Sequence, residues 1–97
     1  MNLTIRVEKL ASHDYVAEVE CNLITARSVA HYPNIESAIR REAEGAVDFA
    51  SFVECKYEGM STGTYKAAEM ARDAGSQARR LVGLYRASRF LALIRQG

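Results

Sequence analysis

The sequence contains little of the material that membrane spans, disulfide frameworks and disordered segments are made of. It has one proline and two cysteines in 97 residues. Because no run of about 18 apolar residues occurs, no segment is expected to span a membrane. Long disorder is not expected either, since 48% of the residues are apolar and can supply a core. These absences favour one folded domain over residues 1–97.

Cysteine and histidine are too sparse to indicate a metal or catalytic centre. Cys21 and Cys55 are predicted to be free, partly buried thiols, because a reducing cytosol disfavours their pairing. His13 and His31 stand at expected loop positions, without a reactive neighbour or an orienting partner at helical spacing. A Cys–His nucleophile remains an alternative that no local signature supports. We therefore predict a non-enzymatic protein with no cofactor and no metal site.

Period-two alternation of apolar and polar residues predicts strands in the first third of the chain. It extends over residues 2–9 and again over 15–21, and residues 23–30 give a third, less regular strand. The links are short, so we expect an antiparallel meander. The alternation leaves no apolar signal-peptide core, which predicts a cytoplasmic protein. The sheet face turned away from the core is expected to be polar, with Arg6, Glu8, Glu18, Glu20 and Arg27.

The middle of the chain is predicted to form a helix and a fourth strand. Asn34 is a suitable N-cap for a helix over residues 35–47, with Gly45 as an alternative end. Apolar residues recur there at helical spacing, although Glu42 falls on the same face. Residues 49–57 are rich in phenylalanine, valine and tyrosine and predict a strand, whose alternation leaves open which face is buried.

The last third of the chain is predicted to be helical. A glycine-containing loop over residues 58–63 precedes Thr64, which is a suitable cap for a helix that continues to Gln96. Residues 73–76 are a candidate break that would give two helices in succession, with Ser76 as the second cap. The first half carries one stripe of mostly small apolar residues, namely Ala67, Met70, Ala71, Ala74, Ala78, Leu81 and Tyr85.

Beyond Gly83 the apolar and polar sides of this helix are no longer separate. Leu84, Phe90, Leu91 and Ile94 fall on the side that is polar in the first half. Too many sides of the segment are apolar for a single buried seam. Either the rest of the fold wraps this end, or the end contacts another chain, most simply in a symmetric homodimer.

The expected order of elements, β-β-β-α-β-α, predicts an α+β fold. The sheet would have about four antiparallel strands, with the helices packed on one face and a long C-terminal helix. No internal repeat and no domain boundary is found in the sequence.

Charge is divided unevenly along the chain. Residues 64–96 carry seven basic and two acidic side chains, a net +5, whereas the rest carries six and ten, a net −4, which sums to +1. Arginines at every seventh position lie on nearly one side of a helix, and a guanidinium makes forked hydrogen bonds to carboxylate or phosphate. The predicted partner-binding residues are Arg72, Arg79, Arg80, Arg86 and Arg89, with Glu18 and Glu20 as a second, acidic patch.

Arg72, Arg79 and Arg86 recur at every seventh position, and we call them the basic column. Two other interpretations of the basic column stay open. It can be a solvated helix face that the protein's own carboxylates partly neutralise. It can also bind nucleic acid, although a net charge of +1 is far from the strongly basic balance of such modules. We therefore favour a protein or nucleoprotein complex as the partner over bare nucleic acid.

Two families resemble this chain in outline. Residues 15–47 have the sequence YVAEVECNLITARSVAHYPNIESAIRREAEGAV, which is similar to the HicB-type antitoxin domain, where a strand pair precedes a helix of the form T-x-x-E-A. Residues 34–38, NIESA, match that helix start loosely, and the usual glycines between the strands are absent. This resemblance implies a nucleic-acid-binding or antitoxin-like regulator that uses the basic helix.

The second resemblance is to anti-CRISPR proteins, which are short phage-encoded inhibitors of bacterial defence. The chain is similar to them in size, in the meander–helix–strand order of residues 3–57, and in its lack of catalytic motifs. This resemblance implies a protein of a phage or mobile element that sterically blocks a CRISPR-type nucleoprotein complex in the host cytoplasm. Neither resemblance transfers a functional residue.

Overall fold

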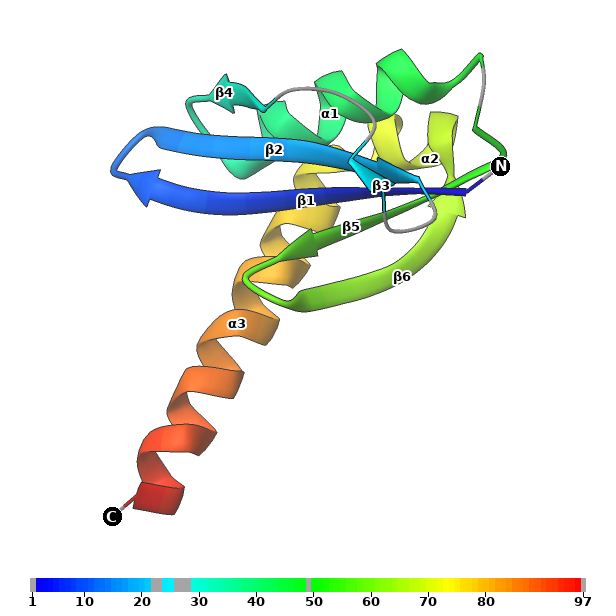
Figure 1. The fold of residues 1–97 in the computed structure, drawn as a ribbon. Helices are drawn as coiled ribbons and strands as arrows, with labels where there is room; N and C mark the ends of the chain where they lie inside the picture. The colour runs from blue at the N-terminus through cyan, green and yellow to red at the C-terminus, as the bar shows by residue number, and fades with distance from the viewer. Residues whose placement is uncertain (1, 22–23, 26–28, 49, 97) are drawn as a thin grey trace.

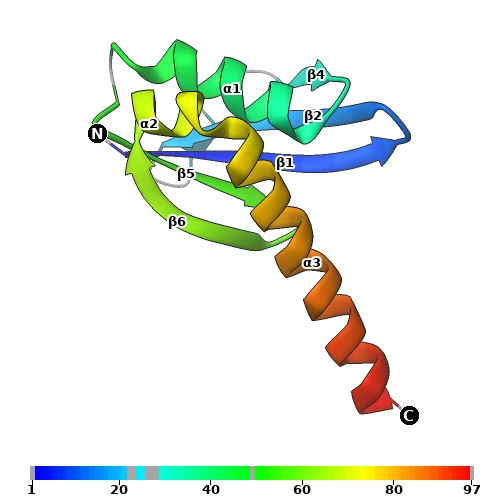
Figure 2. The same cartoon turned by 180° about the vertical axis from the view of Figure 1, so that it is seen from behind.

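The computed structural model describes residues 2–21, 24–25, 29–48 and 50–96, whose arrangement Figure 1 shows. A curved sheet lies against helices on one of its faces, and the C-terminal helix continues well past the sheet. Seen from behind in Figure 2, α1, α2 and the start of α3 cover this face together. The predicted α+β class, the single helical layer and the long last helix are thus confirmed.

The predicted hairpin at the N-terminus is present. β1 (Asn2–Ala11) and β2 (Asp14–Cys21) are antiparallel, with Ile5 opposite Val19. Both of these side chains are buried, which confirms the period-two alternation. The opposite face carries the expected charged residues, all at least partly exposed, and they are Arg6, Glu8, Glu18 and Glu20. Arg27 lies outside the described residues.

The third strand differs from the prediction of one strand over residues 23–30. In the described part of the chain two short strands occur, β3 (Ile24–Thr25) and β4 (Ala30–Tyr32), and both pair antiparallel with β2. Residues 22–23 and 26–28 lie outside the described residues. β4 ends directly before the proline, which has no backbone N–H to donate to a ladder.

α1 (Ile35–Ala46) follows the prediction closely. The Asn34 side chain accepts a hydrogen bond from the Ser37 backbone N–H at 2.7 Å, which satisfies one of the free donors of the first turn. The helix passes through Gly45, so that alternative end is wrong. Its buried face includes Glu42, whose carboxylate accepts a hydrogen bond from the Tyr32 phenol.

The sheet is mixed, which corrects the prediction of an antiparallel sheet. β5 (Phe52–Tyr57) lies beside β1 and runs parallel to it. α1 is the crossover that carries the chain from β4, on one side of the sheet, to the free edge of β1 on the other (Figure 1). Val53 and Cys55 are fully buried, which decides the open alternation of this strand. Residue 49, the predicted start, lies outside the described residues.

Residues 58–63, predicted to be a loop, belong largely to a further strand, β6 (Met60–Lys66). Glu58 and Gly59 have φ values of 50° and 83°, and a type I′ hairpin turn needs positive φ at both central positions. β6 is antiparallel to β5 and contains a bulge near Gly63, where φ is 102°. Within the described residues the sheet therefore has six strands, in the order β3-β2-β1-β5-β6 with β4 also paired to β2.

The C-terminal helical region is broken within the candidate segment 73–76. α2 (Ala67–Arg72) and α3 (Ala74–Gln96) are separated at Asp73. Thr64 lies in β6 and Ser76 lies inside α3, so neither of them is a helix cap, contrary to prediction. The predicted apolar stripe is confirmed: six of its members are buried and the last is partly buried, in the order Ala67, Met70, Ala71, Ala74, Ala78, Leu81 and Tyr85.

Candidate functional site

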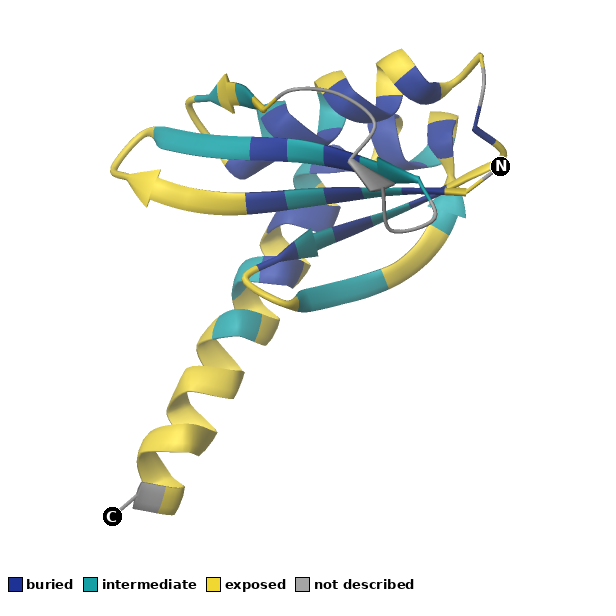
Figure 3. Cartoon of the chain, viewed as in Figure 1, coloured by how far each residue is buried: buried dark blue, intermediate teal, exposed yellow. Residues whose placement is uncertain are grey.

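The second half of α3 projects from the body, and beyond Tyr85, which still packs on Tyr57, the described chain leaves the helix uncovered (Figures 1 and 3). We call residues 84–95 the arm. Its large apolar side chains have exposed fractions from 43% at Leu84 to 64% at Leu93. The expectation that the fold wraps this end is therefore wrong, and contact with another chain stays a prediction. The large apolar residues of the arm are Leu84, Phe90, Leu91, Leu93 and Ile94.

Four apolar residues of the arm line one side of the helix. Leu84, Ala87, Leu91 and Ile94 recur at i, i+3, i+7 and i+10, the spacing of a coiled-coil seam. At 3.6 residues per turn, the middle of this seam lies roughly 130° around α3 from the buried stripe that ends at Leu81. The seam therefore does not continue the domain's own core, and it faces away from the sheet.

Basic side chains lie among the apolar residues of the arm. Arg86, Arg89 and Arg95 are exposed, and no carboxylate of residues 2–21, 24–25, 29–48 or 50–96 forms an ion pair with them. α3 itself contains no aspartate or glutamate. The arm is consequently cationic as well as apolar, and within the described chain its guanidinium groups are available for contacts with another molecule.

The other predicted arginines do not form one column with the arm. Arg72 lies in α2, before the break, and its only recorded ion pair within the described chain is a 3.7 Å contact with Asp73. Arg80 donates a hydrogen bond to the Tyr65 phenolic oxygen at 3.0 Å, and this bond is the main cause that lowers the pKa of Tyr65. Of the five predicted arginines, Arg79, Arg86 and Arg89 thus remain without a recorded side-chain partner among the described residues.

The predicted acidic patch lies on the other side of the molecule. Glu18 and Glu20 alternate along β2 with the buried Ala17 and Val19, so they project from the sheet face that the helices leave open, away from the arginines of α3. The carboxylate of Glu20 pairs with the Arg6 guanidinium at 3.0 Å, and the Glu20 side chain is only 12% exposed. Glu18 lies opposite Arg6 in the strand register. Of the two glutamates, Glu20 is thus already paired with the protein's own Arg6.

One polar pair was missed in the sequence. The Nδ1 atom of His31 lies 2.9 Å from Oδ1 of Asp14, because the pairing of β4 with β2 brings these strand ends together. Seventeen residues separate the two in the sequence, so only knowledge of the strand register could have predicted their contact. An aspartate can orient a catalytic histidine. Both side chains are exposed, by 61% and 43%, and among the described residues no hydroxyl or thiol has a recorded hydrogen bond to His31.

Cys55 is not suited to nucleophilic chemistry in this structure, because its thiol is buried. Cys21 and Cys55 are both free. Burial, with a smaller effect of the Glu54 charge, raises the pKa of Cys55 to about 12, so this thiol stays protonated at neutral pH. No group of three or more histidine, cysteine, aspartate and glutamate side chains in the described part of the chain is placed to hold a metal ion.

No protein-family model matches the chain, and neither the curated proteins nor the solved structures include a significant match to it. Among the described helices, none has the length and apolarity that crossing a lipid bilayer requires. The arm combines exposed apolar side chains with arginines that have no carboxylate partner in the described chain.

Proposed function

We propose that the protein is a non-enzymatic interaction protein that uses the arm to bind a larger protein or nucleoprotein complex and blocks it sterically. The projection of α3 carries this proposal, since it exposes several large apolar side chains beside arginines. Contiguous apolar surface of this kind is typical of interaction sites, and arginine and aromatic residues are enriched in them. An arm of this shape can enter a groove of the partner, while the body covers the surface around it.

The resemblance to anti-CRISPR proteins supports a more specific form of the proposal. The protein would come from a phage or mobile element, and it would inhibit a CRISPR-type nucleoprotein complex in the host cytoplasm. Arginine forks suit both the carboxylates of such a complex and its phosphates. The partner-binding residues would then include Arg86 and Arg89 on the arm and Arg79 at its base.

Target binding by RNA-guided defence complexes tests this function. Purified complexes of several types are mixed with the protein, and binding of their target DNA is followed in a gel-shift assay. We expect the wild-type protein to weaken target binding by at least about tenfold for one of them. The double variant Leu91→Glu/Ile94→Glu should lose this inhibition, because charge on the seam opposes its burial.

A matched control separates the arm from exposed leucine in general. Leu10 at the end of β1 is 59% exposed and lies on the body, so Leu10→Glu should inhibit as well as the wild type. Inhibition of none of the complexes would contradict the specific proposal. Equal loss in the control and in the arm variant would contradict the role of the arm.

A second candidate function is a nucleic-acid-binding regulator, which the composition of α3 favours. This helix has five arginines and no acidic residue. Arginines that bind phosphates release counterions, so the affinity for DNA or RNA should fall steeply with salt, by a log–log slope of about −0.9 per phosphate contact on duplex DNA. Fluorescence anisotropy with labelled oligonucleotides measures this slope. A flat salt response, or no binding, removes this candidate.

A further inference from the structure

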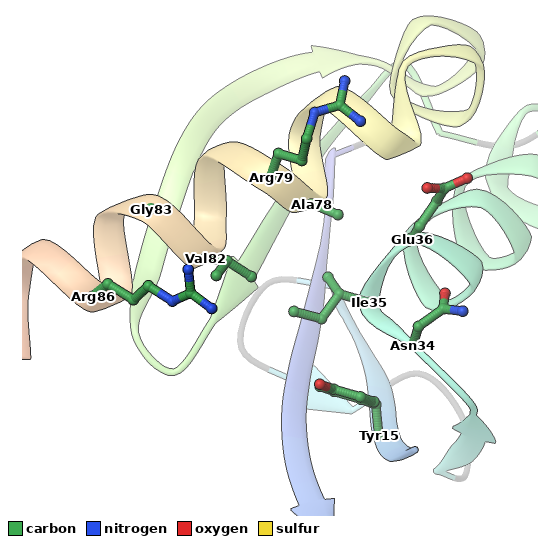
Figure 4. A pocket seen from close by; sticks show the side chains of 9 residues that line it. All are labelled: Tyr15, Asn34, Ile35, Glu36, Ala78, Arg79, Val82, Gly83 and Arg86. Carbon is green, nitrogen blue, oxygen red and sulfur yellow. The ribbon is translucent and has the colours of Figure 1, made fainter. Parts of the chain in front are cut away.

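A groove of about 420 Å³ opens between α3 and the start of α1 (Figure 4). Its floor is apolar and is formed by Ile35, Ala78 and Val82, with the ring of Tyr15 at one end. The volume lies within the range of about 300–1,000 Å³ that is usual for ligand sites. The groove lies at the base of the arm, on the helical side of the sheet.

The charges around the groove are positive in sum. Arg79 and Arg86 stand on the α3 side, about 10 Å apart along the helix at 1.5 Å per residue. Neither has an ion pair with a carboxylate of the described chain. The acidic side chain at the opposite wall, Glu36, already accepts a hydrogen bond from the Arg40 guanidinium at 2.8 Å. The groove therefore has two guanidinium groups to offer to an anion.

Gly83 lies between these arginines, and because it has no side chain it leaves the helix backbone accessible from the groove. A Cβ added there would meet no heavy atom within 4 Å, so packing in the described chain does not require glycine. Its φ is not positive, so the backbone does not require glycine either. Glycine inside a helix costs about 1 kcal/mol relative to alanine. Glycine at position 83 is thus unfavourable for the helix, and neither packing nor backbone conformation requires it. Such a glycine is expected where a ligand lies close to the helix backbone.

We propose that this groove binds an acidic peptide segment of the partner, with apolar side chains between two carboxylates. The apolar side chains would lie on Val82 and Ile35, and the carboxylates would bind Arg79 and Arg86 through forked hydrogen bonds. A separation of about 10 Å corresponds to about three residues of a polyproline II-type extended chain, which rises about 3.1 Å per residue and brings side chains three residues apart to the same side. This inference rests on the proposed function for the source of the segment and adds its chemistry.

Two other occupants fit the groove less well. A nucleic-acid backbone would satisfy the arginines but has no apolar side chain for the floor that Ile35, Ala78 and Val82 form. The arm of a second copy would bring its own Arg89 and Arg95 toward the arginines of the groove, where like charges repel. An acidic peptide with apolar residues complements both the floor and the charge.

An NMR titration of the full chain tests the inference. The probe is the acetylated, amidated peptide Ser-Glu-Leu-Phe-Glu-Ser, whose glutamates are three residues apart. We expect saturable shifts of the amides of Ile35, Ala78 and Gly83, and at least about tenfold weaker binding when the glutamates are replaced by glutamines. Shifts elsewhere, equal binding of the glutamine peptide, or no saturable shift would overturn the inference.

Variants of the groove have matched controls on the same helix. Arg79→Glu/Arg86→Glu should weaken peptide binding at least about tenfold, whereas Arg89→Glu/Arg95→Glu makes the same change in net charge outside the groove and should weaken it less than about threefold. Gly83→Leu should fill the groove and abolish binding while the circular-dichroism spectrum stays unchanged. Equal effects of the two double variants, or intact binding by Gly83→Leu, would refute the site.

The same titration separates the other occupants and the proposed function. If a uridine oligonucleotide shifts the groove amides and displaces the peptide, the ligand of the groove is a phosphate backbone and not an acidic peptide. Peptide binding should survive Leu91→Glu/Ile94→Glu, which affects the arm alone. If Leu91→Glu/Ile94→Glu no longer inhibits but still binds the peptide, the result concerns the arm alone. If the wild type inhibits through the arm but does not bind the peptide, only the inference about the groove is overturned.

Discussion

Glu42 has a carboxyl side chain on the buried face of α1, where it is 5% exposed. The phenol of Tyr32, the last residue of β4, donates a hydrogen bond to its Oε2. This bond ties a short strand to the helix that follows it. It explains why an acidic residue is tolerated at a position that the helical periodicity assigns to the core.

We expect Tyr32→Phe to lower the free energy of unfolding by about 1–3 kcal/mol, because a buried carboxylate loses a hydrogen-bond donor. Urea denaturation followed by circular dichroism measures the change. Tyr65→Phe is the control, since the Tyr65 hydroxyl bonds to Arg80 and to the Thr62 carbonyl in an accessible position. It should cost less than about 1 kcal/mol. Equal losses in both variants would show that burial of Glu42 is not the cause.

Cys55 makes stability depend on alkaline pH. Its pKa is raised from 9.0 to about 12, chiefly by burial. Below pH 9.0 the thiol is protonated in both the folded and the unfolded chain, so its contribution to stability is fully present. As pH rises from 9.0 to about 12, the unfolded chain loses the proton and the folded chain keeps it, so this contribution is lost.

The slope of stability against pH between these values should therefore be steeper in the wild type than in Cys55→Ala, by up to about 1.4 kcal/mol per pH unit. Denaturant titrations across the alkaline range measure both slopes. Tyr57, whose pKa burial also raises, is present in both proteins, so the difference isolates the thiol. Parallel curves would show that the thiol ionises in the folded protein.

At the scale of elements, the hairpin between β5 and β6 depends on a turn with positive φ. Gly59 has φ of 83° there, whereas Gly45 inside α1 has no positive φ and open space around its Cβ position. We expect Gly59→Ala to destabilise the protein by about 1–2 kcal/mol and Gly45→Ala to stabilise it by about 0.5–1 kcal/mol. Urea midpoints of the two variants should move in opposite directions, and a shift of both in one direction would contradict this account of the turn.

The elements found from the sequence are those with a local signal. The alternation in β1 and β2, the Asn34 cap and the apolar stripe of α3 all depend on spacing within one segment. β6 was missed because its serines, threonines and Gly63 are also typical of loops, and its turn is Glu-Gly in place of the commoner Asn-Gly. Its signal was the two-residue link to β5 together with β-branched threonines.

Pairing between strands that are distant in the sequence could not be predicted from local patterns. The parallel pairing of β1 with β5 joins residues about fifty positions apart, and no local pattern specifies it. The candidate site likewise has features with a local sequence signal and features that depend on non-local packing. The excess of arginine and the apolar end were visible in the sequence, whereas the break at Asp73 that separates Arg72 from the other arginines, and the groove beside Gly83, depend on packing.

For the whole molecule, α3 fixes where the positive charge lies. Its first half is held in the core by Ala74, Ala78 and Leu81, and its second half continues the same helix outward. The chain measures 48 × 25 × 24 Å along its principal axes. Because the helix is continuous, the arm cannot fold back onto the open sheet face where Glu18 and Glu20 lie. The uneven charge of the sequence therefore stays divided in space.

A symmetric dimer through the arm would bury the seam at Leu84, Leu91 and Ile94, but it would also place arginines of both copies close together. α3 has no acidic residue to offset this repulsion. Salt screens it, because the Debye length falls from about 10 Å at 0.1 M to about 3 Å at 1 M. We expect a monomer at low salt and any arm-mediated dimer to become stronger as salt rises.

Sedimentation equilibrium at about 0.05 M and about 0.5 M sodium chloride measures this dependence. Leu91→Glu should abolish the dimer at both concentrations, since it puts a charge into the centre of the seam, whereas Leu10→Glu on the body should leave it unchanged. A dimer that weakens with salt, or one that survives Leu91→Glu, would be held by another surface. A strict monomer at both concentrations would leave the seam of the arm free for the different, acidic partner that its arginines favour.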